Sequence, residues 1–408
     1  MSNTLLTISM ITNEALVVLE NMLSFTKTIN RDYDDQFAKS GAKIGDTVNV
    51  RKPVQYTVGT TPTIQLNSTT ESSVPVVLNK QYNIGVSFTT QEQTLSLDMF
   101  SDRILKPQMA AMANKIDYDG MQLYKDIYQQ VGTPGATPSS LETWLNAGVK
   151  LDNAAAPNDG LRYVTLNPAA QAKAIVAGQA FFNPNQDISE QYRRGRMGTY
   201  GGFDWGMDQN TGVQTVGTYA ANVAGGAVTV NGAVTSGSTV ITAGWTSGDI
   251  VNTGDIVTFA GVYSVNPQNR QSTGQLQQFV ATTTTTASGG GAMTLVLSPA
   301  VVFSGNYQNV TSATNSIASG AALAIYGASA TVSPQNMAYH RDAFTFATAD
   351  LELPPGAVGG KRVTNKQTGM SIRFQPFYDG INDRNFYRVD LLGGWATLRP
   401  ELACRVSG

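Results

Sequence analysis

The sequence predicts an α+β fold into which a separate all-β domain is inserted. Three observations carry this prediction. Apolar residues recur at helical spacing in an N-terminal segment and in a longer central one. Alternation typical of strands lies between these segments, within residues 47–88. The composition then changes abruptly, because the only charged residues from Gln209 to His340 are Asp249, Asp255 and Arg270.

The composition indicates a folded protein with much uncharged surface. Hydrophobic residues make up 41% of the 408 residues, and charged residues only 14%, whereas about 25% is typical of soluble domains. Extended uncharged surface usually serves contact with other protein. The net charge of -2 argues against a protein that reads nucleic-acid sequence, since such proteins carry a basic excess.

The setting expected for this chain is cytosolic, without a membrane. The single cysteine, Cys404, excludes an intrachain disulfide. The first residues lack the basic region and the small-residue cleavage site of a secretory signal. No apolar run approaches the roughly 18–20 residues that a membrane span needs.

Residues 1–44 are predicted to form an N-terminal arm that contains an amphipathic helix. Asn13 is suited to cap this helix, and Glu14 suits its first turn. Glu20 lies among the polar positions, and the apolar positions at helical spacing are Leu16, Leu19 and Leu23.

Residues 45–90 are predicted to form two long antiparallel strands joined by an extended loop of about fifteen residues. Residues 91–139 contain the strongest helical pattern of the chain. A helix from Pro107 to Gln130 would span roughly 36 Å at about 1.5 Å per residue. Within residues 140–221, the sequence predicts helices over Leu141–Asn153 and Pro168–Ala180 with a strand over Arg162–Leu166.

Residues 222–332 are predicted to form the inserted domain, after which 333–408 complete the main fold. Short alternating runs separated by turn residues indicate a small antiparallel barrel or sandwich that folds on its own. The threonine- and glycine-rich stretch at 282–291 is expected to be a flexible loop. Asp255 is placed at the start of a strand. Asp249, Asp255 and Arg270 are candidates for contacts to neighbouring subunits, with Asp249 and Arg270 the best placed, or all three charges merely keep the domain soluble.

A search for catalytic or cofactor-binding chemistry finds none. A Ser-His-Asp site would have to use His340, and no Gly-x-Ser-x-Gly motif is present. One histidine and one cysteine do not provide the usual zinc or iron ligand sets. The acidic residues Asp32, Asp34 and Asp35 lack the glycine and the distal glutamate of a calcium loop. We therefore expect no catalytic residue, no cofactor and no metal.

The one basic cluster comprises Arg193, Arg194 and Arg196. It is compatible with non-specific contact to nucleic acid, with contact to an acidic face of another protein chain, or with a solvated loop. The sequence leaves these three interpretations open.

The order of the predicted parts resembles the Hong Kong-97-like capsid fold of tailed bacteriophages, with an N-arm, an extended β-loop, a long spine helix, and peripheral and axial domains. The inserted domain is similar to that of the coat proteins of short-tailed Salmonella phages. The stretches that carry the likeness are 45–53 (GDTVNVRKP), 192–204 (YRRGRMGTYGGFD), 254–262 (GDIVTFAGV), 336–344 (NMAYHRDAF) and 387–401, which begins YRVD and ends RPE.

This resemblance implies a major capsid protein whose copies form hexamers and pentamers of an icosahedral shell around a genome. The partners it implies are the chain itself, a scaffolding protein and a portal protein, with decoration proteins as a further option. It also implies that Glu14 and Glu20 contribute to scaffold contact, and that assembly takes place in the host cytoplasm. The loop tip from Thr57 to Ser73 contains no lysine, which argues against the covalent cross-linking that some members of the fold perform.

The sequence offers three alternatives to a capsid protein. An enzyme would need a glycosidase-type pair of carboxylates such as Asp249 with Asp255, but a turn role for both Gly-Asp steps is favoured. An encapsulin-type compartment shell shares the fold, but encapsulins typically lack an inserted domain of this size. A phage tail or fibre protein would share the Thr/Ser/Gly-rich β-domain, but the long central helix speaks against it.

Overall fold

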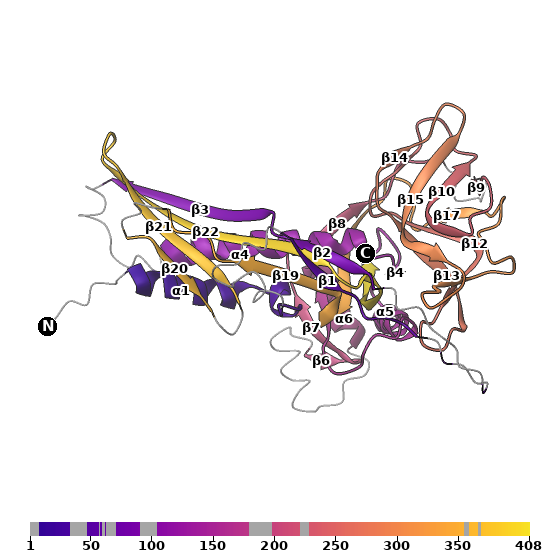
Figure 1. The fold of residues 1–408 in the computed structure, drawn as a ribbon, viewed down its shortest axis with the longest axis horizontal. Helices are drawn as coiled ribbons and strands as arrows, with labels where there is room; N and C mark the ends of the chain where they lie inside the picture. The colour runs from indigo at the N-terminus through magenta and orange to yellow at the C-terminus, as the bar shows by residue number, and fades with distance from the viewer. Residues whose placement is uncertain are drawn as a thin grey trace. The chain divides into compact units, whose positions relative to one another are not determined.

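The computed structural model describes residues 8–32, 47–56, 58, 62, 71–89, 104–178, 198–220, 228–354, 359–365 and 369–408. The chain divides into two compact units, and each draws on separated stretches of sequence (Figure 1). Unit 1 comprises Met1–Lys52, Ser73–Gly120 and Phe344–Leu398, and unit 2 comprises Pro53–Ser72, Met121–Ala343 and Arg399–Gly408. Helices and strands mix in both units, so the predicted α+β class is confirmed.

Unit 1 is built on a five-stranded antiparallel sheet around its longest strand, β22 (Arg384–Thr397). The first half of β22 lies between β21 (Ser371–Asp379) and β3 (Lys80–Thr89), and its second half pairs with β19 (Phe344–Ala349). The remaining strand, β20 (Lys361–Thr364), pairs with β21. The long strands run side by side in Figure 1.

The predicted strand pair at 45–90 is confirmed in its first part and wrong in its second. β1 (Thr47–Arg51) pairs antiparallel with β2 (Ser73–Val77). The second predicted strand is divided after Val77, because β3 joins the five-stranded sheet instead. Most of the loop between β1 and β2 lies outside the described residues.

Helix α1 (Ile8–Met22) packs against β20 and β21. Its predicted start at Asn13 is wrong, because helical backbone already begins at Ile8. The turn after α1 is held by a buried carboxylate, that of Asp117, which accepts hydrogen bonds from the backbone N–H of Ser24 (2.7 Å) and of Thr26 (3.1 Å).

The predicted helix from Pro107 to Gln130 is too long at its C-terminal end. Helix α4 (Lys106–Met121) gives way to a 3₁₀ turn, η3 (Gln122–Asp126), and strand β4 begins at Gln130. Ile127 is buried, but its backbone is extended (φ -85°, ψ 123°) because it leads into β4. The apolar spacing thus continues beyond the helix because the next segment also belongs to a core.

Unit 2 contains a seven-stranded mixed sheet, here called the β18 sheet. Its strands are β4 (Gln130–Gly132), β5 (Arg162–Leu166), β6 (Thr199–Tyr200), β7 (Phe203–Met207), β8 (Gly212–Thr215), β18 (Val332–His340) and β23 (Ala403–Ser407). The bounds of β5 and of helix α5 (Leu141–Asn153) are as predicted. Helix α6 (Pro168–Gly178) begins where predicted, and 179–180 lie outside the described residues.

The inserted segment of unit 2 forms an antiparallel barrel (Figure 1, orange). Its strands are β9 (Thr229–Val230), β10 (Ser236–Ala243), β12 (Ile256–Val265), β13 (Ser272–Ala281), β15 (Ala292–Val302), β16 (Val310–Thr311) and β17 (Leu323–Ile325). Neighbours pair in the order β9-β10-β15-β13-β12-β17. Backbone bonds from Leu323 to Val228 and from Val230 to Ala321 close the ring, so the predicted barrel is confirmed.

The stretch at 282–291 is not the flexible loop that its composition predicts. Thr285–Thr286 form β14, which pairs with β11 (Ile250–Val251), and Ala287 is buried. The hydroxyl of Thr284 accepts a hydrogen bond from the Thr253 N–H (3.0 Å). Low-complexity sequence is therefore compatible with order here, because neighbouring strands supply the partners.

Candidate assembly site: the junction beneath the inserted barrel

The core of the barrel reaches upstream of the predicted boundary at residue 222. Val216 and Tyr219 belong to the same buried apolar cluster as Phe259 and Phe279 of strands β12 and β13. The Tyr219 N–H donates to the Ser329 hydroxyl (2.9 Å). The segment after β8 is thus shared between the β18 sheet and the barrel.

Asp255 lies immediately before β12, as predicted, but it is buried rather than exposed, with 2% of its surface accessible. Its carboxylate accepts hydrogen bonds of 2.8 Å from the backbone N–H of Gly217, the backbone N–H of Asn252 and the side-chain amide of Gln214. Burial raises the pKa of the Asp255 carboxyl, and these three bonds oppose that rise.

A buried arginine lies beside this carboxylate. Arg405, on β23, is fully buried and donates from Nη1 to the Gly254 carbonyl (2.8 Å). Its guanidinium lies over the Tyr124 ring at 5.8 Å from the centroid, a cation–π arrangement. Burial lowers the pKa of Arg405 to about 10, so it stays charged at neutral pH. Nε and Nη2 have no hydrogen-bond partner within the described structure.

Tyr124 and Gln214 join these two charges into one network. The Tyr124 hydroxyl, from η3, donates to the Gln214 side-chain oxygen (3.0 Å), while the Gln214 amide nitrogen donates to Asp255. Gly212 must be a glycine, because a Cβ atom there would lie 2.4 Å from the Tyr124 ring. We call Tyr124, Gln214, Asp255 and Arg405 the junction network. It ties the β18 sheet to the base of β12.

The outer edge of β4 is closed by side chains of the barrel. β4 pairs with β23 on one side only. On its other side, the Gln278 amide accepts from the Gln130 N–H (2.9 Å) and donates to the Gln130 carbonyl (2.9 Å), and the Tyr326 hydroxyl donates to the Gly132 carbonyl (2.5 Å). An open edge invites pairing with another chain. The barrel therefore satisfies the backbone groups that would otherwise offer that edge.

Asp249 also has an internal role. It is 7% exposed, and its carboxylate accepts from the backbone N–H of Thr246 (2.9 Å) and of Ala220 (3.1 Å). Arg270 lies in the turn between β12 and β13 with a positive φ of 60°, and its Nη1 donates to the Gly305 carbonyl (3.3 Å). No salt bridge joins Asp249 to Arg270 in the described structure. Of the two, only Arg270 is partly exposed.

The predicted scaffold residues lie on α1. Glu14 and Glu20 are both partly exposed. The Glu20 carboxylate accepts from the Asn365 side-chain amide at 2.8 and 2.9 Å. Arg193, Arg194 and Arg196, like Asp34 and Asp35, lie outside the described residues.

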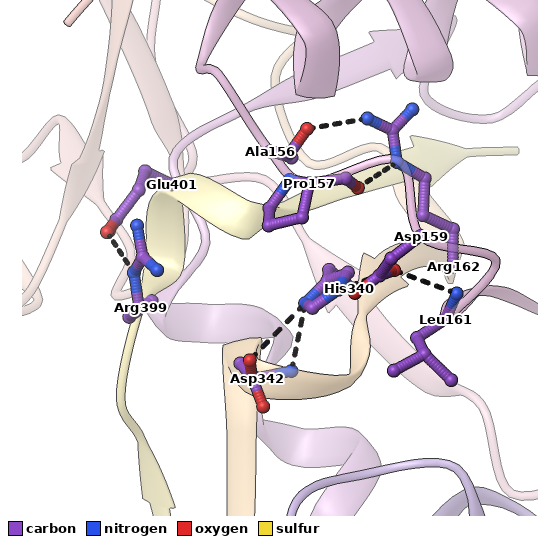
Figure 2. Close-up of polar contacts among 9 residues, drawn as sticks. All are labelled: Ala156, Pro157, Asp159, Leu161, Arg162, His340, Asp342, Arg399 and Glu401. Atoms are coloured by element: carbon purple, nitrogen blue, oxygen red, sulfur yellow. Dashed lines mark hydrogen bonds and ion pairs between the residues drawn. The ribbon is translucent and has the colours of Figure 1, made fainter.

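His340 is buried, and its ring nitrogens are hydrogen-bonded within the subunit (Figure 2). It is 1% exposed, its Nε2 lies 3.1 Å from an Asp159 carboxylate oxygen, and its Nδ1 accepts from the Asp342 N–H (3.2 Å). These bonds fit a neutral ring protonated on Nε2. Nε2 thus links β18 to the loop before β5, where Arg162 donates to the carbonyls of Ala156 and Pro157, while Nδ1 holds the turn that follows β18.

The residues that sequence reasoning missed are the partners of the predicted ones. Arg405 could have been noticed, because it is a charge within an otherwise small and apolar C-terminal strand. No local signal marks Tyr124 or Gln214, since these two hydrogen-bonded residues lie 90 positions apart in the sequence. Over the described residues, no group of three or more His, Cys, Asp or Glu side chains could hold a metal ion. No described helix has the length and apolar character of a membrane span.

A family model described as "P22 coat protein - gene protein 5" matches residues 1–406. No curated protein matches the sequence. Similar solved structures include "Mycobacterium phage Che8" (11% identity, 94% of this chain and 90% of that chain, TM-score 0.49). A second is "Capsid structure of the Cyanophage P-SCSP1u" (10% identity, 89% of this chain and 83% of that chain, TM-score 0.44). A third is "Capsid of Ralstonia phage GP4" (8% identity, 93% of this chain and 86% of that chain, TM-score 0.43).

Proposed function

We propose that copies of this chain assemble noncovalently around a scaffolding protein. The chain belongs to the P22 coat protein family, so it is a major capsid protein that forms a phage shell. The family match confirms the predicted relationship to the coat proteins of short-tailed Salmonella phages, and with it the predicted Hong Kong-97-like fold. The encapsulin and tail-protein alternatives are set aside on the same ground. The observation that carries the assignment is the match over 1–406.

The finer features of assembly belong to this proposal. The shell is icosahedral, is built of hexamers and pentamers, closes on a portal protein at one vertex, and is assembled in the host cytoplasm. The chain has no catalytic function of its own. This is supported by the way its chemistry-bearing side chains are used, since His340 and Asp255 are buried and hydrogen-bonded within the subunit.

Co-expression with and without the scaffolding protein, followed by sedimentation, tests this proposal. Closed shells that contain scaffold are the expected product, and the chain alone should give fewer or aberrant particles. A discrete subunit that never sediments as a particle under either condition would refute an assembly role.

We further propose that α1 contacts the scaffolding protein through Glu14 and Glu20. Exposed ion pairs are screened by salt beyond about 8–10 Å, so scaffold content should fall as ionic strength rises. The double charge reversal Glu14→Lys with Glu20→Lys should reduce co-assembly. Glu20→Gln is the matched control, because its amide oxygen can still accept from Asn365. Unchanged scaffold content in the double reversal would rule out this contact.

Two basic sites complete the proposal. Arg270, in a partly exposed barrel turn, is proposed to contact a neighbouring subunit, and Arg270→Gln should alter particle size. Asp249 and Asp255 would influence assembly only through the barrel whose backbone they stabilise.

The cluster of Arg193, Arg194 and Arg196 is proposed to contact packaged DNA without sequence preference. Its triple replacement by glutamine should therefore lower DNA retention in filled particles.

A further inference from the structure

Unit 2 contains an open cleft beside the closed edge of β4. It has a volume of about 480 Å³ and is lined by one face of α5, by β4, by β13 and by Tyr326. This volume lies within the range of roughly 300–1,000 Å³ that is usual for ligand pockets. The lining is polar, and among the described residues that form it Lys150 is the only charged one.

Lys150 belongs to a helix face that is turned to the cleft. Thr143, Asn146 and Lys150 line the cleft at positions i, i+3 and i+7 of α5, which share one side of a helix. None of these three side chains has a hydrogen bond or salt bridge within the described structure. Burial lowers the pKa of the half-buried Lys150. A partly buried ammonium without a counter-ion is costly, and an anion would relieve that cost.

Two side chains on the other walls of the cleft already have their hydrogen bonds made. Gln278 is bonded in both directions to the backbone of Gln130, and Tyr326 is bonded to Gly132. Thr133 and Gln275 also offer polar side chains to the cleft, but the only ammonium in the described lining is on α5, where a hydroxyl and an amide flank it. Such a set can bind one carboxylate together with an adjacent peptide group.

We propose that this cleft binds an acidic side chain of a second copy of the chain, with its carboxylate on Lys150 and its adjacent peptide group on Asn146 and Thr143. A second copy is the occupant because a coat protein lies against other copies throughout a shell, and this inference rests on that role. A nucleic-acid phosphate fits less well, since grooves that bind nucleic acid carry several cations and this cleft carries one.

Lysine acetylation tests the proposal in the intact chain. In unassembled subunits, Lys150 should react because it lines an open cleft. In empty shells its acetylation rate should fall by about tenfold, because a nearby carboxylate raises an amine pKa by about one unit or more. Lys173, exposed on α6, is the control and should react at a similar rate in both states. Equal Lys150 rates in subunits and empty shells would overturn the proposal, as would protection found only in DNA-filled particles.

Zero-length carbodiimide cross-linking identifies the partner. Shells assembled from a mixture of ¹⁴N- and ¹⁵N-labelled subunits should yield peptides in which Lys150 of one isotope is joined to an aspartate or glutamate of the other. Lys150→Met should lower shell yield and Lys150→Arg should restore it, while Lys173→Met should have no effect. Closed shells with no mixed-isotope link at Lys150, and normal yield from Lys150→Met, would refute the cleft contact and leave the coat-protein role intact.

Discussion

Each unit contains a buried or nearly buried aspartate, and the two are stabilised in different ways. In unit 1, the side chain of Asp119 is 10% exposed and pairs with Lys80 and Lys115, each at 2.9 Å. In unit 2, Asp255 has no salt bridge within the described structure and is surrounded by three N–H donors. Burial raises the pKa of both carboxyls, but at Asp119 the two lysines outweigh burial, so that its pKa is lowered, while at Asp255 burial wins.

The comparison teaches that these two carboxyls should contribute to the pH dependence of stability in opposite directions. A lowered folded-state pKa contributes stability above the usual value of 3.8, and that contribution is lost as pH falls through the folded pKa. A raised folded-state pKa contributes stability at low pH that is lost as pH rises through the folded pKa. Asp119 thus favours unit 1 at neutral pH, whereas protonation of Asp255 favours unit 2 as the solution becomes acidic.

The largest effect is expected from Asp255→Ala. It removes the acceptor of three hydrogen bonds and leaves buried donors unsatisfied, which should cost about 3–5 kcal/mol in the free energy of unfolding. Urea unfolding of the unassembled subunit measures the loss, and amide exchange of barrel peptides should locate it in unit 2. Asp204→Ala, at an exposed position of β7, is the matched control. A loss as small as that of the control would mean that the network does not hold the junction.

A matched pair of glycine substitutions should sharpen the comparison at about 1–3 kcal/mol each. In Gly212→Ala the new Cβ atom would meet the Tyr124 ring at 2.4 Å, and in Gly120→Ala it would meet the Trp395 ring at the same distance. Peptide-resolved amide exchange should show unit 2 loosened by the first and unit 1 by the second. Identical exchange patterns in the two variants would show that the units do not respond separately.

The smallest effect concerns Asp119→Asn. Its partners Lys80 and Lys115 are 42% and 60% exposed, so solvent screening limits the loss to roughly 0.5–1 kcal/mol at neutral pH. The loss should shrink as pH falls below the usual carboxyl pKa. Asp255→Asn should instead lose the acid stabilisation of the wild type, so its disadvantage should grow on acidification. Thermal unfolding from neutral to acidic pH measures both, and parallel pH profiles would contradict the opposite pKa shifts.

What the sequence could predict follows from the range over which its patterns act. The bounds of α5 and β5 and the existence of an antiparallel barrel depend on local periodicity and turn residues, and all were predictable. The end of α4 was not predictable, because the apolar spacing continues through Ile127. This residue is buried, but its backbone is extended rather than helical. The order at 282–291 was missed because it depends on pairing with β11.

The candidate site was harder to predict than the fold. Charges within a low-charge domain suggested surface contacts, yet Asp249 and Asp255 serve backbone donors inside the subunit. The partner Gly217 precedes Asp255 by 38 residues, and Arg405 contacts Gly254 from 151 residues away. Such pairs exist only after the insertion has folded against the β18 sheet, so no local pattern reveals them.

Cryo-electron microscopy of particles assembled from the full chain tests the central claim most directly, namely that this is a shell subunit whose barrel is fixed to the β18 sheet by buried side chains. We predict closed shells in which the density of the barrel is as well defined as that of the β18 sheet, with the carbonyl of Gly254 against Arg405. Particles that are open or tubular, or closed shells in which the barrel density is smeared relative to that sheet, would contradict the account.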